Sequence, residues 1–539
     1  MTCAELLIAL LRDRYGADTV FGIPGVHTVE LYRGLADSGL RHITPRHEQG
    51  AGFMADGYAR ATGKPGVCFI ITGPGMTNIA TAMGQALADS VPMLVVSSVN
   101  RRDTLGRGQG RLHELPSQQL LLAGVARFSH TLLDPAALPE VLARAFAVFN
   151  GMRPGPVHIE IPIDLFDAEV SAPTQWSAPA IHRPAPDPAG LATAAAWLHD
   201  AKRPLVLLGG GCVAAPEAAR ALVERLDAPT VTTINAKGLL GNGDGASPSP
   251  RHPLDLGANA ALPAVRELAH DADVILAIGT ELGETDYDVV FDDGFLLTGR
   301  LIRVDLDPEQ LVRNQSLSLG LIADAGATLE ALLAHFPTAL SRQGQVRTAA
   351  ALEALALPLD PAFAPFVPLF DTLNEVMPEA ILVGDSCAPV YAANHLVTKS
   401  EPRRFFNAST GYGTLGYGLP AALGAKLARP DLPVVAMVGD GGVMFTLSEI
   451  ATAVEERLPV VILLWHNGGY EEIRRYMAAN GVTPIGVNLH APEFQTLANG
   501  FGCLSTRVED PASLAKALAQ RPEQGPLLIE IDAHRWSTG

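Results

Sequence analysis

Cysteine is scarce in this chain, with five residues among 539 and no C-x-x-C pair. This pattern predicts neither a disulfide framework nor a zinc cluster, and it fits a protein of the reducing cytoplasm. Runs of basic residues are also missing, since no stretch of Lys and Arg is longer than a pair and the formal net charge is −18. A chain with this charge is not expected to clamp nucleic acid phosphates.

Long apolar runs are absent as well, because none reaches the roughly 18 residues that a membrane span requires. Residues 1–18 space their apolar side chains as a helix does but include Glu5, Arg12 and Asp13, which predicts a first helix and not a signal peptide. Hydrophobic residues make up 48% of the chain and charged ones 18%, a balance typical of a compact α/β enzyme. No membrane association is expected.

Short apolar runs alternate with helical patterns along most of the sequence, which is the β-α-β rhythm of parallel sheets covered by helices. Pro- and Ala-rich stretches at 171–190 and 354–365 interrupt this rhythm and are typical of linkers. We therefore predict an α/β fold of three domains, each a mainly parallel sheet flanked by helices, at 1–170, 188–340 and 360–539. No repeat of fixed period is visible.

Two glycine-rich motifs follow successive apolar runs near the end of the chain. Asp440 lies in the Gly-Asp-Gly-Gly of residues 439–442, and Asn467 lies in the Asn-Gly-Gly of residues 467–469. A helix of about three turns from Thr446 onward and one strand between them would bring both to the same edge of a parallel sheet. A carboxylate, an amide oxygen and glycine carbonyls form half of an oxygen-only shell, which suits Mg²⁺ or Ca²⁺ when a phosphate supplies the rest. On its own, Gly-Asp-Gly would be read as a turn.

The spacing of the two motifs, with twenty-five residues between Gly441 and Asn467, resembles the cofactor-binding signature of thiamine-diphosphate enzymes. The resemblance implies that Asp440, Asn467 and the Gly469 carbonyl hold the metal. It also implies that Gly441, Gly442 and Gly468 let the diphosphate approach the backbone. The usual Asn-Asn pair is His466-Asn467 here.

A second motif, RHEQGAGFMADGYAR at 46–60, resembles the pyrimidine-side motif of the acetolactate synthase-like family. The resemblance implies that Glu48 is the catalytic carboxylate, which would bond the aminopyrimidine ring and favour the tautomer that takes the thiazolium proton. The alternative is that Glu48 only complements a helix dipole. Its occurrence with the Gly-Asp-Gly motif and with Thr-Gly-Pro-Gly at 72–75 favours the catalytic interpretation.

The third part of the resemblance is GYGTLGYGLP at 411–420, in which the Gly413 carbonyl would accept the 4′-amino group and Leu415 would support the bent cofactor. Ordinary core packing of Leu415 stays open. Ser386 and Cys387, at another strand end, are candidate diphosphate contacts. The family resemblance covers all three predicted domains and implies a homodimer or homotetramer, with Glu48 and the metal of each active site coming from different subunits.

The resemblance further implies decarboxylation of a 2-oxo acid through ylide addition and an enamine. Several positions depart from acetolactate synthase, namely Leu112-His113-Glu114 in place of its Phe-Gln-Glu, and Glu472, Ile473 and Tyr476 in the pocket helix. The Met-His-Gly loop has no counterpart near 255, and the glycines at 209–211 lack the spacing of a dinucleotide fingerprint, which speaks against bound FAD. His113 is the candidate proton relay.

A carboxylate at 472 would favour a substrate with a cationic far end if it lies in the pocket, because a buried charge must be paired. The segment 467–477 resembles the corresponding stretch of 5-guanidino-2-oxopentanoate (2-ketoarginine) decarboxylases, and residues 279–288 add four more acids. Pairing of Glu471 or Glu472 with Arg474 or Arg475 on a solvated helix face is the alternative. The favoured prediction is a 2-ketoarginine decarboxylase. The alternatives are an acetolactate synthase catalytic subunit, a benzoylformate-type decarboxylase and an inactive cofactor-binding regulatory protein.

Overall fold

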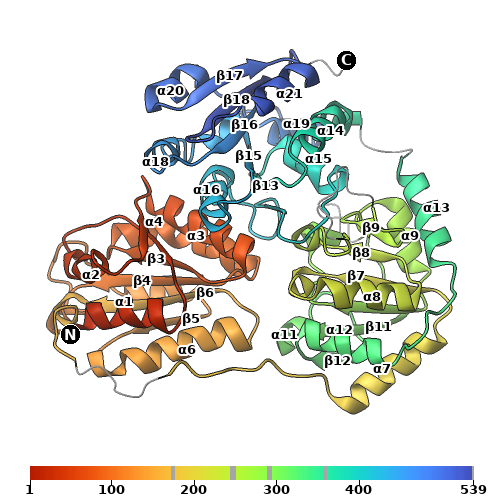
Figure 1. Cartoon of the computed structure of the whole chain (residues 1–539), viewed down its shortest axis with the longest axis horizontal. Coiled ribbons are helices and arrows are strands. Elements are labelled where there is room, and N and C mark those ends of the chain that lie inside the picture. The colour runs from red at the N-terminus through yellow and green to blue at the C-terminus, as the bar shows by residue number, and fades with distance from the viewer. Residues whose placement is uncertain (171–176, 243–250, 288–293, 357–360, 537–539) are drawn as a thin grey trace.

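Three parallel sheets, each of six strands and each covered by helices, make up the computed structural model of the chain (Figure 1). The structure describes residues 1–170, 177–242, 251–287, 294–356 and 361–536. Parts of the two predicted linkers, 171–176 and 357–360, lie outside the described residues. The predicted α/β class and the three sheets flanked by helices are confirmed. Among the described residues, no helix is both long and apolar enough to cross a bilayer.

The first sheet has the strand order β2-β1-β3-β4-β6-β5. Its strands are β1 (Thr19–Gly22), β2 (Arg41–Ile43), β3 (Gly66–Ile70), β4 (Met93–Val99), β5 (Phe128–Thr131) and β6 (Pro156–Pro162). Its helices are α1 (Cys3–Asp13), α2 (Val29–Leu35), α3 (Glu48–Thr62), α4 (Pro74–Ala88), α5 (Gln118–Ala123) and α6 (Leu138–Gly151). The predicted first helix is present, and Thr2 and Glu5 form a capping box at its N-terminus.

The second sheet has the order β12-β11-β10-β7-β8-β9. Its strands are β7 (Pro204–Leu208), β8 (Thr230–Thr232), β9 (Asp255–Gly257), β10 (Val274–Ile278), β11 (Arg300–Asp305) and β12 (Leu319–Ile322). Its helices are α7 (Pro188–Asp200), α8 (Pro216–Leu226), α9 (Pro263–His270), α10 (Glu284–Tyr287), α11 (Pro308–Leu311), α12 (Ala325–Ala334) and α13 (Gly344–Ala356). This order places a topological switch point between β7 and β10, because the chain continues from β7 to β8 on one side and from β10 to β11 on the other.

The third sheet has the order β14-β13-β15-β16-β18-β17, which is the order of the first sheet strand for strand. Its strands are β13 (Ile381–Gly384), β14 (Phe405–Asn407), β15 (Val434–Gly439), β16 (Val460–His466), β17 (Leu504–Val508) and β18 (Leu527–Asp532). Its helices are α14 (Val367–Val376), α15 (Ala388–Leu396), α16 (Gly418–Ala428), α17 (Asp440–Val443), α18 (Glu449–Glu455), α19 (Glu471–Ala479), α20 (Phe494–Phe501) and α21 (Pro511–Ala519).

The helix between the two glycine-rich motifs is shorter than predicted. The sequence pattern predicted about three turns from Thr446 onward, whereas α18 has seven residues and starts at Glu449. Residues 444–448 form consecutive turns instead, because the chain must first reverse after the short helix α17 at the strand end. The short 3₁₀ helices of the chain are η1 (Arg102–Thr104), η2 (Pro135–Ala137), η3 (Ile163–Leu165), η4 (Gly210–Cys212), η5 (Ile234–Ala236) and η6 (Pro361–Phe366).

Helices α3 and α16 join the first and third sheets across the middle of the molecule (Figure 1). The two backbones approach so closely that a Cβ at Gly57 would lie 2.0 Å from the carbonyl oxygen of Ala421, and one at Gly424 would lie 1.9 Å from that of Met54. Only glycine fits at such an approach. Side chains from both sheets, among them Phe53 and Tyr417, belong to one buried apolar cluster. The first and third sheets therefore share a hydrophobic core.

Candidate active site

Two adjacent strand ends bring Asp440 and Asn467 together. Asp440 follows β15 and Asn467 follows β16, and these strands pair in parallel. The Asp440 side chain is buried, and it accepts hydrogen bonds from the backbone N–H of Gly441 at 3.0 Å and of Gly468 at 2.8 Å. Burial raises the pKa of Asp440, while these N–H groups oppose the rise. The structure thus holds the Asp440 carboxylate buried and hydrogen-bonded at the carboxyl edge of the sheet.

Three potential metal ligands converge at this edge. The side-chain amide of Asn467 lies 3.1 Å from Asp440 Oδ1 and 3.0 Å from the carbonyl oxygen of Gly469. When the amide nitrogen faces them it donates to both, and when the amide oxygen faces them three oxygens point at one another, which only a cation makes favourable. In an octahedral Mg²⁺ shell with bonds near 2.1 Å, neighbouring oxygens are about 3 Å apart. The spacing of these groups therefore fits Mg²⁺.

His466 stands beside this group, where the family signature has asparagine. Its Nδ1 is 3.0 Å from Oε1 of the buried Glu530, and its Nε2 is 3.9 Å from Asp440 Oδ2. No three His, Cys, Asp or Glu side chains gather as a metal cluster anywhere in the described part of the chain. A site built from one carboxylate and two neutral oxygens agrees with that result, and it depends on a phosphate for the remaining ligands.

Ser386 and Cys387 lie after β13, the neighbour of β15 on the other side. Both are partly buried, and Cys387 precedes the first residue of α15. The order β14-β13-β15-β16 therefore lines up four strand ends, which carry the glycine-rich loop, Ser386, Asp440 and Asn467 in turn. The boundary between β13 and β15 is the switch point of this sheet, where ligands of open α/β sheets bind.

The buried Asp385 ties the glycine-rich loop to the end of β13. Its carboxylate accepts from the backbone N–H of Ser386 at 2.8 Å and of Gly416 at 2.9 Å. Burial raises its pKa to about 6, and the backbone donors oppose this. The loop so fixed presents Gly413 with a positive φ of 71° and open space beside it, and the half-buried Leu415 follows. Both predicted positions thus lie in the loop that Asp385 holds at the end of β13.

Glu48 is the first residue of α3, after the N-cap His47. Its Oε2 accepts a hydrogen bond of 2.9 Å from the amide of Asn78 on α4, and its Oε1 faces Gly75 in the predicted Thr-Gly-Pro-Gly turn. The carboxylate therefore also complements the dipole of α3, as the alternative interpretation held. Among the described residues, the Glu48 side chain is hydrogen-bonded to Asn78, and no hydrogen bond joins it to Asp440, Asn467 or Gly413.

His113 packs against the same turn. A Cβ at Gly73 would lie 2.8 Å from the His113 Cβ, and the His113 backbone has a φ of +62°, which non-glycine residues rarely adopt. Its ring is 5.2 Å from the ring of His27, and the Nδ1 atoms of both are buried without a partner. Burial and the neighbouring His113 lower the pKa of His27. Unpartnered ring nitrogens and a strained backbone are features of functional loops.

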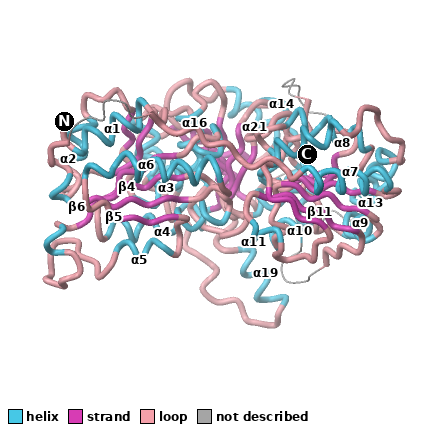
Figure 2. Tube along the Cα trace, turned by 90° about the horizontal axis from the view of Figure 1, so that it is seen from below, coloured by secondary structure: helices cyan, strands magenta, loops and turns pink. Residues whose placement is uncertain are grey.

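Helix α19, which carries the predicted substrate residues, has no buried residue within the single chain. Figure 2 shows it standing away from the body of the molecule. The side chain of Glu472 is 58% exposed and lies 3.9 Å from Arg475, and Ile473 and Tyr476 are exposed too. Glu471 pairs with Arg474 at 2.5 Å. Within one chain, α19 therefore shows the ion pairing that the alternative interpretation expected, and burial of Glu472 would require a second chain.

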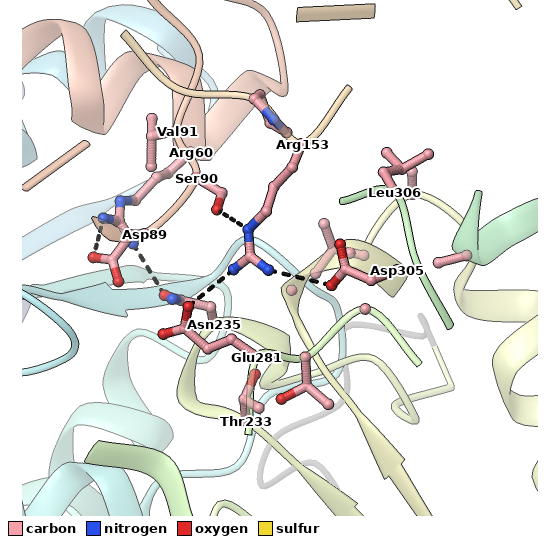
Figure 3. Close-up of a pocket in the computed structure, with 18 of the residues that line it drawn as sticks. Arg60, Asp89, Ser90, Val91, Arg153, Thr233, Asn235, Glu281, Asp305 and Leu306 are labelled. Atoms are coloured by element: carbon pink, nitrogen blue, oxygen red, sulfur yellow. Dashed lines mark hydrogen bonds and ion pairs between the residues drawn. The ribbon is translucent and has the colours of Figure 1, made fainter. Parts of the chain in front are cut away.

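A cavity of about 340 Å³ lies where the three sheets meet, at the switch point of the second sheet (Figure 3). Arg153 reaches into it and donates to Ser90 at 2.7 Å and to Asp305 and Glu281 at 3.2 Å each. Burial raises the pKa of Asp305 and of Glu281, and raises that of Asp286 to about 7.

Part of the acidic stretch 279–288 lines the cavity. Glu281 and Asp286 line it, whereas Asp288 lies outside the described residues. It also borders the glycine-rich loop, because Thr410 and Gly411 line it and the Gly411 N–H donates to Thr285 at 3.3 Å. The acids of the second sheet therefore lie close in space to the loop with Gly413, although they are far from it in sequence.

Sequence reasoning missed four residues of this region: His27, Asn78, Asp385 and Glu449. Asp385 could have been found, since Val-Gly-Asp ends β13 at 383–385 as it ends β15 at 438–440. Asn78 and His27 carry no motif that marks them. Glu449 is buried against the start of α3, about 400 residues away in sequence, and nothing local signals that contact.

The chain matches three models of one protein family. Residues 1–121 match the thiamine pyrophosphate enzyme N-terminal TPP binding domain, residues 191–332 its central domain and residues 384–531 its C-terminal TPP binding domain. Among curated proteins, the chain is 45% identical to "Probable 2-ketoarginine decarboxylase AruI" of Pseudomonas aeruginosa, covering 98% of this chain and 94% of that protein.

Acetolactate synthases are similar over the same length. The chain is 31% identical to the acetolactate synthase large subunit of Parasynechococcus marenigrum, covering 98% of this chain and 87% of that protein. It is also 31% identical to the acetolactate synthase isozyme 1 large subunit of Escherichia coli, covering 98% and 93%. All three relatives align along the whole of this chain and not along one domain only.

Proposed function

The chain belongs to the thiamine pyrophosphate enzyme family, and from this premise we propose that it is a thiamine-diphosphate- and Mg²⁺-dependent 2-oxo acid decarboxylase that acts on 2-ketoarginine. The products are 4-guanidinobutanal and CO₂. The observation that supports 2-ketoarginine as the substrate is the 45% identity, along 98% of the chain, to a relative named as a 2-ketoarginine decarboxylase. The acetolactate synthases, at 31%, are less similar.

In this proposal Asp440, Asn467 and the Gly469 carbonyl hold Mg²⁺. The spacing of about 3 Å between their polar atoms supports this assignment. The diphosphate lies against the backbone of Gly441, Gly442 and Gly468 and against Ser386 and Cys387, all of them at neighbouring strand ends. Gly413 and Leu415 contact the pyrimidine half of the cofactor.

When bound, thiamine diphosphate supplies the carbanion and the electron sink that decarboxylation of a 2-oxo acid requires. The part of Glu48 is to share a proton with the ring nitrogen of the cofactor. Because Asn78 already donates to Glu48 Oε2, Oε1 is the oxygen that can carry this proton. His113 delivers a proton to the product, and its left-handed backbone aims the ring at the turn beside Glu48.

The enzyme is a homodimer or homotetramer with its active sites between subunits. In the described part of one chain, the Glu48 carboxylate is hydrogen-bonded to Asn78 of its own domain and not to the metal-site residues, which supports completion of the site by a second chain. Large apolar side chains are exposed around the metal-binding residues and on and after α19, which supports a protein partner there. These side chains are Tyr412, Met444, Phe445, Ile473, Tyr476 and Ile485.

In the assembled enzyme, α19 of one subunit covers the substrate, with Ile473 and Tyr476 against its chain and Glu472 facing its guanidinium group. A planar guanidinium pairs with a carboxylate through two parallel hydrogen bonds. The exposed position of Glu472 in the single chain leaves its carboxylate available for this pairing.

The test is CO₂ release by the purified protein with Mg²⁺ and thiamine diphosphate, with 2-ketoarginine, pyruvate and benzoylformate in parallel. Turnover of 2-ketoarginine with kcat/KM at least about tenfold above the others supports the proposal. Formation of acetolactate from pyruvate would replace it with an acetolactate synthase activity, and preference for benzoylformate with an aromatic 2-oxo acid decarboxylase. No turnover of any of the three would favour an inactive cofactor-binding protein.

The pocket assignment has its own control. Glu472→Gln should raise KM for 2-ketoarginine about tenfold or more and leave KM for an uncharged 2-oxo acid unchanged, since only the cationic substrate loses its partner. Glu509→Gln, at an exposed carboxylate that pairs with Arg535, serves as the matched control. An equal effect of Glu472→Gln on both substrates would remove Glu472 from the cation site.

A further inference from the structure

Glu449 is a fully buried carboxylate at the contact between α18 and the start of α3. Its two oxygens accept hydrogen bonds from the backbone N–H of Arg46, at 3.0 and 3.1 Å, and Oε1 also accepts from that of His47 at 3.1 Å. The Thr452 hydroxyl donates to Oε2 at 2.6 Å. A residue of the third sheet's domain thus holds the two peptide groups that come directly before Glu48.

All of these partners are donors, so the ionised carboxylate, which only accepts, is the form that satisfies them. Burial raises the pKa of Glu449, and the N–H groups of Arg46 and His47 and the Thr452 hydroxyl oppose the rise. Gly50, one turn into α3, leaves room for the carboxylate, since a Cβ there would lie 2.2 Å from Glu449 Oε1. The contact is therefore built from both sides.

The end of α18 makes two further contacts with the first sheet's domain near the surface. Glu455 pairs with the Arg46 side chain, and Glu456 pairs with Arg41 of β2 at 2.7 Å, each pair having at least one exposed partner. Exposed ion pairs of this kind contribute little to stability. A buried carboxylate that accepts from three donors fixes the backbone far more tightly. Glu449 is thus the contact that sets where α3 begins.

We infer that Glu449 is a positioning residue for Glu48, fixing the backbone from which the Glu48 carboxylate projects towards the cofactor. The inference rests on the proposed function, because Glu48 is the residue through which Glu449 acts. Glu449 touches neither substrate nor cofactor in this scheme. Catalytic groups must be held to within about 0.5 Å, which the two backbone hydrogen bonds and the helix start achieve together.

Glu449→Gln tests this inference, because an amide NH₂ group cannot accept from the backbone donors that one carboxylate oxygen now satisfies. We expect kcat to fall at least tenfold, with KM and the affinity for thiamine diphosphate changed less than twofold. Glu456→Gln, which removes a carboxylate that pairs with Arg41 of β2 and not with the start of α3, should leave kcat unchanged. Gly50→Ala should lower kcat as Glu449→Gln does, because it displaces the same carboxylate from the other side.

A double-mutant cycle separates positioning from a general loss of structure. If Glu449 acts through Glu48, Glu449→Gln lowers kcat in the wild-type background but not further in the Glu48→Gln background. An equal fold-loss in both backgrounds would overturn the inference, since the effect would then bypass Glu48.

Hydrogen exchange of the cofactor-free protein supplies a readout that needs no activity. In Glu449→Gln, the amides of residues 45–50 should exchange at least tenfold faster, while those of α16 keep their wild-type rates. Unchanged exchange at 45–50, or faster exchange throughout α16, overturns the inference. If the wild-type protein decarboxylates no 2-oxo acid, the proposed function fails, and the exchange result still decides whether Glu449 holds this backbone.

Discussion

The backbone N–H of Gly468 donates to Asp440 Oδ2 across 2.8 Å, joining the residues that follow β15 and β16. The backbone therefore orients the carboxylate, with Oδ1 3.1 Å from the Asn467 amide, which itself lies 3.0 Å from the Gly469 carbonyl oxygen. A site arranged in advance loses little conformational entropy when its ligands bind. Metal binding at the proposed site of Asp440, Asn467 and the Gly469 carbonyl should accordingly depend on Asp440 more than on any other side chain.

Replacement of Asp440 by alanine should raise the Kd for thiamine diphosphate in the presence of Mg²⁺ by about tenfold or more. It should also remove most of the dependence of cofactor binding on Mg²⁺, because Asp440 supplies the only carboxylate of the proposed metal site. Isothermal calorimetry with and without EDTA measures both effects. Asp431→Ala, at an exposed residue paired with Arg429, is the control, and wild-type Mg²⁺ dependence in Asp440→Ala would locate the metal elsewhere.

Glu48→Gln should keep thiamine diphosphate bound and lower kcat by about 100-fold or more, because a general acid–base group contributes on that scale. Steady-state kinetics with saturating cofactor, together with a binding titration, separates the two quantities. Glu30→Gln, at an exposed carboxylate paired with Arg33, should behave as wild type. Turnover within twofold of wild type in Glu48→Gln would show that another group handles the proton.

His113→Asn should lower kcat by about tenfold or more and leave cofactor affinity unchanged, since the ring is assigned to proton transfer and not to binding. His27→Asn should have a smaller effect in the same direction, because His27 packs 5.2 Å from His113 and supports its orientation. His130→Asn, at a ring stacked on Phe128, is the control. Unaltered pH–rate profiles in both variants would argue against a relay through these histidines.

Asp385 should make the protein less stable as pH rises from 4 to 6. Its pKa is raised to about 6 in the folded protein, so this contribution is fully present below the pKa of the unfolded chain, near 4, and is lost as pH passes 6. At about 1.4 kcal/mol per pH unit, the loss is about 3 kcal/mol.

Thermal unfolding of wild type and Asp385→Asn at pH 4 and pH 7 tests this expectation. The variant should show a smaller fall in Tm between the two pH values, although its Tm at pH 4 is lower because a backbone donor loses its acceptor. Asp431→Asn provides the comparison. Parallel pH profiles for wild type and Asp385→Asn would mean that Asp385 stays ionised in the fold.

The sequence sufficed for the features that depend on local pattern. Alternating apolar runs predicted the parallel sheets, and strand ends carrying Asp440 and Asn467 were predicted to be neighbours because one helix and one strand separate them. The predicted length of the helix after Asp440 was wrong, since residues 444–448 form turns before α18 begins. Propensity alone does not show where a chain reverses after a strand.

Contacts between distant segments could not be predicted. The bond from the Arg46 N–H to Glu449 joins residues 403 apart, and no spacing rule applies at that separation. The first and third sheets share one strand order without any visible sequence repeat, because buried apolar positions accept many residues. The exposed state of Glu472 likewise follows from tertiary placement, which a motif does not encode.

The glycine contact between α3 and α16 bears on how the chain folds during synthesis. Residues 48–62 leave the ribosome more than 350 residues before residues 418–428, which complete their core. At a synthesis rate of about 5–20 residues per second, α16 is made roughly 20 seconds or longer after α3, and the apolar face of α3 is not covered by α16 during that time. Packing of α3 against α16 is therefore a late event in synthesis, and the nascent N-terminal region exposes apolar surface until it occurs.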